Sequence, residues 1–374
     1  MARISRWADS RLKTIGEYIA SCYVSNTFPT SNFKFYENRR DYKDLHRTGI
    51  YSDNDFILFF KVIEKTNRVD EGLVAEMLDG KFNIATKLLE IAFDDKLLLI
   101  YEYLDTITIN AYNYLRSSSF SYTIKKGVTF NFFSSLLEYL DKHKKTGKLD
   151  GSCKSDIFFF GRLGKKSRSI DYYGKNFSLL QEDIQLTYPT FNNNFIFALD
   201  NISTTICTTQ NTVLSYCHGD FHDFNFSLDG IYWDIDTFGF NSIISDFTIY
   251  YWHFYGREEF LISKYNPWLN MHMYNQLSAS ELLDIRLLKK EVILSWSNSL
   301  SQNYERLNVE QSCIKKEFLF RLFCRVFLVD NVLKFDIEDR RLIYSFFNEI
   351  VEKNDCPLAD TIFNTSKDVG LVAK

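Results

Sequence analysis

One stretch of the chain gathers acids, an amide and a histidine at spacings that could support metal-assisted chemistry on a hydroxyl group. It begins with His218-Gly-Asp220, reaches Asn225 five residues later, and ends in an acidic run that contains Asp234 and Asp236. Carboxylate and amide oxygens suit Mg²⁺, whose other ligands are usually waters and substrate phosphates. A carboxylate held beside such a metal, but not bound to it, can orient and deprotonate a hydroxyl group. We therefore interpret Asn225 and Asp234 as metal ligands, leave Asp236 open as a third, and interpret Asp220 as the base.

A tight hairpin is expected to position these groups. Asp229-Gly230 stands between two short apolar runs, and this dipeptide favours a two-residue turn. Counting outward from that turn places Asn225 opposite Asp234, and directly opposed residues have Cβ atoms about 4.5–5.5 Å apart. Asp236 would project from the same face as Asp234. The competing interpretation is a hairpin with surface acids, because Asp and Asn are common beside turns. We interpret Asp229 as such a surface acid.

The motif at the start of this stretch resembles that of a known family. His218-Gly-Asp220 with Asn225 is similar to the H-G-D-x-x-x-x-N catalytic loop of the aminoglycoside phosphotransferase and choline kinase superfamily. The resemblance implies the bilobal fold of protein kinases, an α+β fold with a small β-rich N-lobe and a larger, mainly helical C-lobe. It also implies ATP and Mg²⁺ as cofactors, with Asp220 as the catalytic base and His218 as part of the catalytic loop.

The acidic run fits the metal-site segment of the same family. That segment often reads I-D-[FW]-[ED], with a Gly five residues after its first Asp and another Asp twelve residues after it. Asp234, Asp236, Gly239 and Asp246 match this register, which favours Asp234 over Asp236 as the principal ligand. The resemblance implies that Asp246 supports the catalytic loop without touching substrate. Trp233 departs from the usual aliphatic residue, and the hairpin is shorter than usual in the family.

A cation is also needed on the nucleotide phosphates. Lys61 is the best candidate, because a Lys inside the apolar, strand-like run 56–63 calls for a partner. Glu76, in the helix that follows, resembles the Lys-pairing glutamate of the family. Glu71 is its competitor, and Glu64 is a weaker one. The alternative for Lys61 is a solvated side chain on an edge strand.

The end of the last N-terminal strand resembles the hinge of the family. Glu102-Tyr103-Leu104 would hold the adenine ring through backbone hydrogen bonds. A Gly-rich phosphate loop is not visible, and Gly49 stands almost alone ahead of Lys61.

The pattern of apolar residues predicts the elements that carry these groups. Short apolar runs at 56–63, 87–93 and 96–103 predict strands, the last two joined at Asp94-Asp95, and 69–78 has helical spacing. Beyond residue 105 the spacing is mostly helical. We expect an amphipathic helical extension over residues 1–30 that packs on the main body, an N-lobe over 31–104 and a C-lobe over 105–374.

Composition excludes several classes of protein. A chain of 374 residues with 45% apolar and 25% charged residues is an ordinary globular composition, too long for one small core. A net charge of −4 does not fit a nucleic-acid binder. No apolar stretch is long enough to span a bilayer. Seven scattered cysteines without a C-x-x-C pair favour reduced thiols in a cytoplasm over a disulfide frame or a zinc site.

The acceptor is expected to be a hydroxyl of a small molecule. Only twelve positions separate Asp234 from Asp246, and no signature of a peptide-binding activation segment follows. A saccharide, an amino alcohol or another polar metabolite remains open, as do a nucleotide-binding pseudokinase without turnover and a protein kinase. The sequence does not indicate an oligomeric state.

Two groups of residues could contact the acceptor. A basic set between residues 143 and 190 could favour an acceptor that carries phosphate or carboxylate (Lys165, Lys166 and Arg168). Aromatic residues after the acidic run could stack on a sugar or enclose an ammonium group, although core packing is the preferred interpretation for most of them (Tyr250, Tyr251, Trp252, His253, Tyr255 and Trp268).

Overall fold

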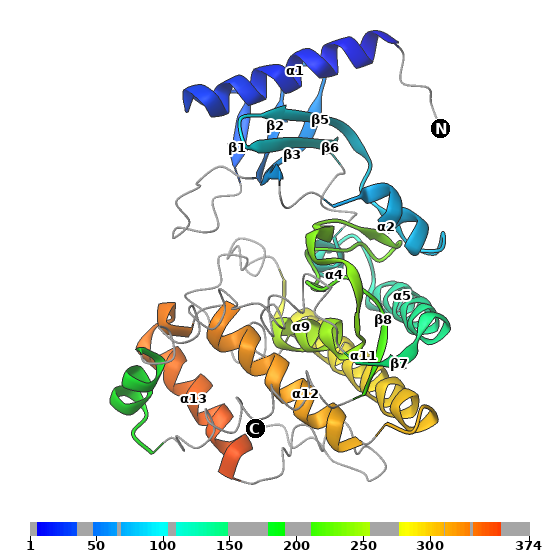
Figure 1. Ribbon diagram of the computed structural model, residues 1–374, viewed down its shortest axis with the longest axis vertical. Coiled ribbons are helices and arrows are strands. Elements are labelled where there is room, and N and C mark those ends of the chain that lie inside the picture. The colour runs from blue at the N-terminus through cyan, green and yellow to red at the C-terminus, as the bar shows by residue number, and fades with distance from the viewer. Residues whose placement is uncertain are drawn as a thin grey trace.

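A small lobe built on an antiparallel sheet lies above a larger helical lobe in the computed structural model of the chain (Figure 1). The structure describes residues 6–35, 48–65, 69–103, 110–148, 179–190, 211–254, 277–309, 311–329 and 332–352. The predicted α+β class, with a β-rich N-terminal part and a mainly helical C-terminal part, is confirmed. The boundary near residue 105 stays a prediction, because residues 104–109 lie outside the described ranges. No helix in these ranges has the length and apolarity needed to cross a membrane.

Strands rich in aromatic and aliphatic residues form the sheet of the small lobe. Within the described ranges its order is β1-β2-β3-β6-β5, with antiparallel neighbours throughout. The strands are β1 (Phe33–Phe35), β2 (Thr48–Ser52), β3 (Ile57–Glu64), β5 (Lys87–Phe93) and β6 (Lys96–Glu102). The predicted hairpin at Asp94-Asp95 joins β5 to β6, and Asp94 takes a left-handed conformation there (φ 46°). Lys61 therefore lies on a strand paired on both sides and not on an edge strand, with Thr48 and Leu99 as its neighbours.

The amphipathic helix predicted near the N-terminus is α1 (Arg6–Ser25), which crosses one face of this sheet (Figure 1). Leu12, Ile15 and Ile19 are buried against the sheet and share its core. The contact is close at Gly16, where an added Cβ would lie 2.6 Å from the side chain of Ile91 on β5. The helix thus forms part of the small lobe.

A short parallel pairing ties the two lobes together. After α2 (Glu71–Met77), which is capped by Asp70, the chain forms β4 (Asn83–Ile84). This strand pairs with β9 (Ile231–Tyr232), which belongs to the predicted hairpin. The backbone of the small lobe is therefore hydrogen-bonded to the element that carries Asp234.

The large lobe packs helices around a three-stranded sheet of order β10-β8-β7. Its described strands are β7 (Lys145–Gly147), β8 (Thr212–Cys217) and β10 (Gly239–Ser242). Its described helices are α4 (Ala111–Arg116), α5 (Tyr122–His143), α9 (Ile244–Phe254), α11 (Ala279–Arg306), α12 (Gln311–Phe323) and α13 (Ile337–Glu352), with a helical segment at 179–187. Shorter turns are η2 (Ile235–Thr237), η4 (Cys324–Val329), which is a π-helix, and η5 (Val332–Lys334).

Aromatic side chains fill the core of the large lobe. Phe221 stacks on Phe226 at 4.4 Å between ring centroids and meets Trp296 edge-on at 5.5 Å. Tyr250, Tyr251 and Trp252 are each at most 3% exposed, so the core role preferred for them is confirmed. Tyr255 and Trp268 lie outside the described residues. Phe221 and Phe226 are thus part of the packed core, and this packing fixes the loop between them.

Candidate active site

The loop that begins at His218 is held by a buried carboxylate. It leaves β8 at Cys217, and Asp246, in the first turn of α9, accepts hydrogen bonds from the backbone N–H groups of His218 and Gly219, both at 2.7 Å. Burial raises the pKa of Asp246, against the opposing effects of His218 and the two N–H groups. These contacts support the loop, which is the role that the resemblance implied for Asp246.

The turn itself requires glycine. Gly219 has φ +82°, a left-handed conformation, and a Cβ at this position would lie 2.4 Å from the carbonyl oxygen of Thr237. The hydroxyl of Thr237 in turn donates to the carbonyl of His218 at 2.9 Å. The loop therefore lies against η2, the turn that follows Asp234, at a distance that no other residue type allows.

His218 is a structural member of this loop. Its side chain is buried, with Nε2 2.9 Å from the carbonyl of Trp233 and Nδ1 accepting from the backbone N–H of Asp220 at 3.3 Å. Because Nδ1 accepts, Nε2 carries the proton and donates to Trp233. Both ring nitrogens are thus used to join the loop to the hairpin, and the structure places His218 as a support for Asp220.

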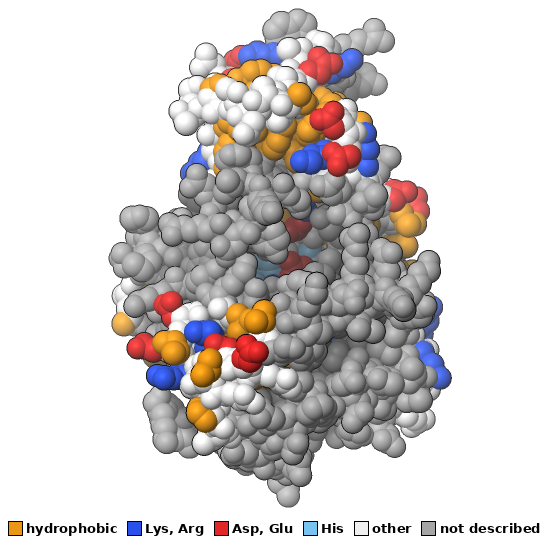
Figure 2. All heavy atoms as spheres, turned by 60° about the vertical axis from the view of Figure 1, so that its left-hand side comes forward, with side chains coloured by type: hydrophobic (Ala, Val, Ile, Leu, Met, Phe, Trp, Pro, Cys, Tyr) orange, Lys and Arg blue, Asp and Glu red, His pale blue; other side chains and the backbone are white. Residues whose placement is uncertain are grey.

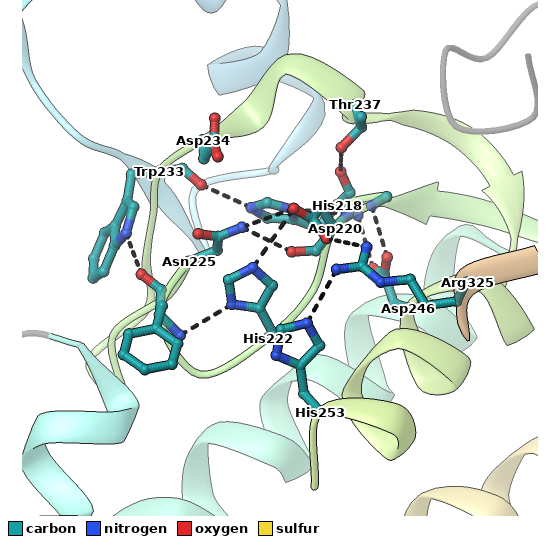
Figure 3. A network of polar contacts seen from close by, with 12 residues as sticks. His218, Asp220, His222, Asn225, Trp233, Asp234, Thr237, Asp246, His253 and Arg325 are labelled. Atoms are coloured by element: carbon teal, nitrogen blue, oxygen red, sulfur yellow. Dashed lines mark hydrogen bonds and ion pairs between the residues drawn. The ribbon is translucent and has the colours of Figure 1, made fainter. Parts of the chain in front are cut away.

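Asp220 lies at the centre of the polar network (Figure 3). Its Oδ1 accepts from Nη1 of Arg325 at 2.8 Å, while Oδ2 lies 3.5 Å from both Nε2 of His222 and Nδ2 of Asn225. About a quarter of its side chain is exposed. Burial alone would raise its pKa, but the charge of Arg325, aided by the two histidines, holds the pKa of Asp220 well below its usual value. The carboxylate is therefore ionised and accessible, as a base for a hydroxyl group must be.

The hairpin forms, but its predicted register is wrong by one residue. Phe226 pairs with Tyr232, and the N–H of Trp233 donates to the carbonyl of Asn225, so Trp233 and not Asp234 lies opposite Asn225. The turn spans three residues and places Gly230 at φ +91°. A side-chain bond selects this turn, because Oγ of Ser227 accepts from the N–H of Ile231 at 2.9 Å.

Asn225 is nonetheless oriented as a ligand would be. Its Nδ2 donates to the backbone carbonyl of Asp220 at 2.9 Å. The amide is buried, at 5% exposure, and its oxygen lies on the side away from Asp220 (Figure 3). An amide oxygen in that position is available to a cation.

Asp234 follows β9 at the end of the hairpin and has a left-handed backbone conformation (φ 56°, ψ 47°). This conformation is uncommon for a residue other than Gly, Asn or Asp. Its Oδ1 is bonded to the ammonium group of Lys61. That positive charge, against the effect of burial, lowers the pKa of Asp234. The side chain is 45% exposed, so the carboxylate faces the space between the lobes with a cation already on it. Asp236 lies in η2, and its side chain is outside the described part of the structure.

The predicted pair of Lys61 with Glu76 is not formed. Glu76 is exposed on α2, and the described bond of Lys61 is to Asp234. The competitor Glu71 accepts from the hydroxyl of Tyr101 at 2.8 Å and lies 3.4 Å from the ammonium of Lys87. The side chain of Glu64 lies outside the described residues. The small lobe therefore presents Lys61 directly to the carboxylate of Asp234.

The predicted hinge is described only in part. Glu102 ends β6, with its side chain exposed and its N–H donating to the carbonyl of Thr86 at 3.1 Å. Tyr103 follows it, and Leu104 lies outside the described residues. Gly49 is a packing glycine within β2, because a Cβ there would lie 2.7 Å from the ring of Phe60. The connection between β1 and β2, residues 36–47, is outside the described part, so the phosphate loop stays untested.

The donor set fits a hard divalent cation held by few protein ligands. In the described ranges, no three His, Cys, Asp or Glu residues gather as a metal site would require. An amide oxygen of Asn225 and a carboxylate of Asp234 suit Mg²⁺, which commonly takes one or two protein ligands and completes its shell with waters and phosphates. These two oxygen donors thus fit Mg²⁺ that takes its remaining ligands from elsewhere.

Arg325 and His222 were not singled out from the sequence, and His253 was named there only among the aromatic residues that could contact the acceptor. Arg325 donates from η4, and its Nη2 lies 3.2 Å from Nε2 of His253 at the end of α9. The ring of His253 stacks on that of His222, with centroids 4.1 Å apart and an angle of 11°. Arg325 has no local signal, because it lies 105 residues from Asp220. His222 lay inside the quoted motif and could have been included.

In the space-filling view, acidic and histidine side chains are visible between the two lobes (Figure 2). The small lobe contributes Lys61 to the site, and the large lobe contributes Asp220, Asn225 and Arg325. One cation thus comes from each lobe, Lys61 beside Asp234 and Arg325 beside Asp220.

The sequence matches no family model and no curated protein. Among solved structures, the chain is similar to an aminoglycoside-3'-phosphotransferase of type VIII, with 15% identity, 74% of this chain and 99% of that chain covered, and a TM-score of 0.37. It is also similar to a glucosamine kinase (7% identity, 89% and 83% covered, TM-score 0.39) and to choline kinase LicA from Streptococcus pneumoniae (13%, 82% and 98%, 0.32). Similarity at this level does not assign an activity, which has to be inferred from the residues of the site.

Proposed function

We propose that the protein is an ATP- and Mg²⁺-dependent phosphotransferase that moves the γ-phosphate of ATP onto a hydroxyl group of a small polar metabolite. One observation carries this proposal: a single loop and hairpin hold an ionised, accessible Asp220, the amide of Asn225 and the carboxylate of Asp234, and Lys61 of the small lobe bonds to Asp234. Phosphoryl transfer depends mainly on positioning and charge stabilisation, and these four groups supply both.

Each residue then has a defined task. Asn225 and Asp234 would hold Mg²⁺, which would neutralise charge on the phosphates. Lys61 would bind the same phosphates from the small lobe. Asp220 would orient the acceptor hydroxyl and take its proton as the new bond from the acceptor oxygen to the γ-phosphorus forms and the bond to the β–γ bridging oxygen breaks. ADP carries away the bridging oxygen, and no covalent enzyme intermediate is needed.

The segment after the metal site supports a small acceptor. The residues between Asp234 and Asp246 form η2, then β10 paired with β8, and then the first turn of α9. Asn241, Ser242 and Ile244 in this segment are completely buried. A stretch folded into the core in this way offers no extended surface to a peptide. Lys165, Lys166 and Arg168 lie outside the described residues, so the class of acceptor, whether saccharide or amino alcohol, stays open.

A cytoplasmic location belongs to the same proposal. Cys22 and Cys217 are both buried as thiols, as expected in a reducing compartment.

Metal-dependent nucleotide binding is the first test of this function. The melting temperature should rise with ATP and Mg²⁺ together, since a ligand at about 100 times its Kd stabilises the folded state by about 2.7 kcal/mol. ATP alone or Mg²⁺ alone should give much smaller shifts. Lys61→Met should lose most of the shift, whereas Lys87→Met, which alters another ion-paired lysine of the same sheet, should keep it. Equal shifts with and without Mg²⁺ would contradict the assignment of Asn225 and Asp234.

A further inference from the structure

Arg325 holds one oxygen of the proposed base and leaves the other accessible. Its Nη1 lies 2.8 Å from Oδ1 of Asp220, a charge-assisted hydrogen bond of ordinary length. The neighbours of Oδ2, His222 and Asn225, are both 3.5 Å away, at the limit of hydrogen bonding. The carboxylate is therefore fixed at one oxygen and loosely contacted at the other (Figure 3).

Arg325 is itself fixed on its far side. A guanidinium group only donates, so Nε2 of His253 must accept the bond from Nη2, at 3.2 Å. His253 stacks on His222, whose Nε2 faces Asp220. Arg325 and His222 thus both contact Asp220, and His253 links the two from behind. Arg325 and His253 are each 8% exposed, and His222 is 7% exposed.

The helix that carries Arg325 is anchored to the strands that carry the loop. One turn earlier, Arg321 is completely buried and donates to Glu317 at 2.8 Å and to Oδ1 of Asn241 on β10 at 3.3 Å. Glu317 accepts from the hydroxyl of Thr212 on β8 at 2.7 Å. Arg325 then lies in the π-helical turn η4, a distortion often found at functional sites. Its position relative to Asp220 is therefore set by a buried polar network.

We propose that Arg325 is a positioning residue for phosphoryl transfer. Its hydrogen bond to Oδ1 orients Asp220 so that Oδ2 faces the acceptor hydroxyl. This inference rests on the proposed function. An unheld carboxylate would rotate about its side-chain bonds, and small misplacements of a reacting group can cost about 10²-fold in rate. Arg325 acts through Asp220 and does not itself take the proton.

Steady-state kinetics of Arg325 variants test this role. Arg325→Met should lower kcat by about 10- to 100-fold, with the KM values for ATP and acceptor changed by less than about twofold. Arg325→Lys should recover part of the lost kcat, because an ammonium group can replace the N–H of Nη1 that bonds to Oδ1 of Asp220. Arg340→Met is the matched control. It breaks another partly buried Arg–Asp pair, with Asp183, and should leave kcat unchanged even if it lowers the melting temperature.

A double variant separates a positioning role from a merely structural one. If Arg325 acts through Asp220, Arg325→Met should cost nothing further in an Asp220→Asn background. Additive losses, an unchanged or higher kcat, or a rise in the acceptor KM alone would each overturn the inference while leaving the proposed function standing. If the unaltered protein transfers phosphate to no acceptor, the proposed function fails and this inference fails with it. Should Arg325→Met fail to fold, the Arg325→Lys comparison decides.

Discussion

Asp220→Asn should lower kcat for phosphotransfer by about 10²–10⁴-fold, the usual contribution of a positioned general base. Asparagine keeps the shape of the side chain, and its carbonyl oxygen can still accept from Arg325, so the loop should remain in place. What is lost is the ionised carboxylate that takes the hydroxyl proton. Binding of Mg·ATP should be little affected, because Asp220 is not a proposed metal ligand. The measurement is the initial rate of ADP formation with a working acceptor, together with the melting-temperature shift produced by Mg·ATP.

Asp229→Asn is the control for this variant. Asp229 lies in the turn of the same hairpin, is exposed, and bonds to the hydroxyl of Ser227. Its replacement should change kcat by less than about twofold, as expected for a surface substitution. If Asp220→Asn kept full activity, Asp220 could not be the base.

Asp234→Asn is expected to have a comparable or larger effect, a loss of about 10³-fold or more in kcat/KM for Mg·ATP. Metal-ion charge stabilisation contributes several kcal/mol to such reactions, and each 1.36 kcal/mol corresponds to tenfold in rate. Asparagine tolerates the left-handed backbone (φ 56°), so the fold should survive. The lost contact with Lys61 is partly exposed and should cost at most about 1 kcal/mol of stability. Initial rates measured across Mg²⁺ concentrations would reveal the loss, which added Mg²⁺ should only partly restore.

Asp79→Asn offers a matched comparison. Asp79 is also left-handed, at φ 54°, and its half-exposed carboxylate pairs with Lys142. It differs from Asp234 in lying away from the catalytic loop, at the end of α2. Asp79→Asn should therefore leave the Mg²⁺ dependence intact. If both variants retained activity, the metal would have to be held by other residues.

The elements that carry the site could be predicted from local patterns. Apolar runs of strand length gave β3, β5 and β6, because each is bounded by turn residues such as Asp94. The loop at 218–225 was recognisable because its requirements are local: Gly219 must adopt a left-handed turn, and Asn225 must reach back to the carbonyl of Asp220. A loop whose contacts lie within eight residues can be recognised from the sequence alone.

The parts that could not be predicted depend on distant or side-chain contacts. The observed hairpin register differs from the predicted one by one residue. The hydroxyl of Ser227 and the left-handed conformation of Gly230 stabilise a three-residue turn in place of a two-residue turn. Lys61 meets Asp234, 173 residues away, and not the nearby Glu76. Arg325 bonds to Asp220, 105 residues away, one turn after the buried Arg321 that bonds to Asn241 on β10. No local pattern carries information of that kind.

Phosphorus NMR is the most direct measurement of the central claim, that this site transfers phosphate from ATP to a small hydroxyl compound. The protein would be incubated with Mg·ATP and a panel of hexoses, amino sugars, sugar acids and amino alcohols. We predict a new phosphomonoester signal that grows in equal amount with ADP, requires Mg²⁺ and one class of acceptor, and is lost with Asp220→Asn. ADP appearing only with inorganic phosphate, or ATP left unconsumed with every acceptor, would contradict the account.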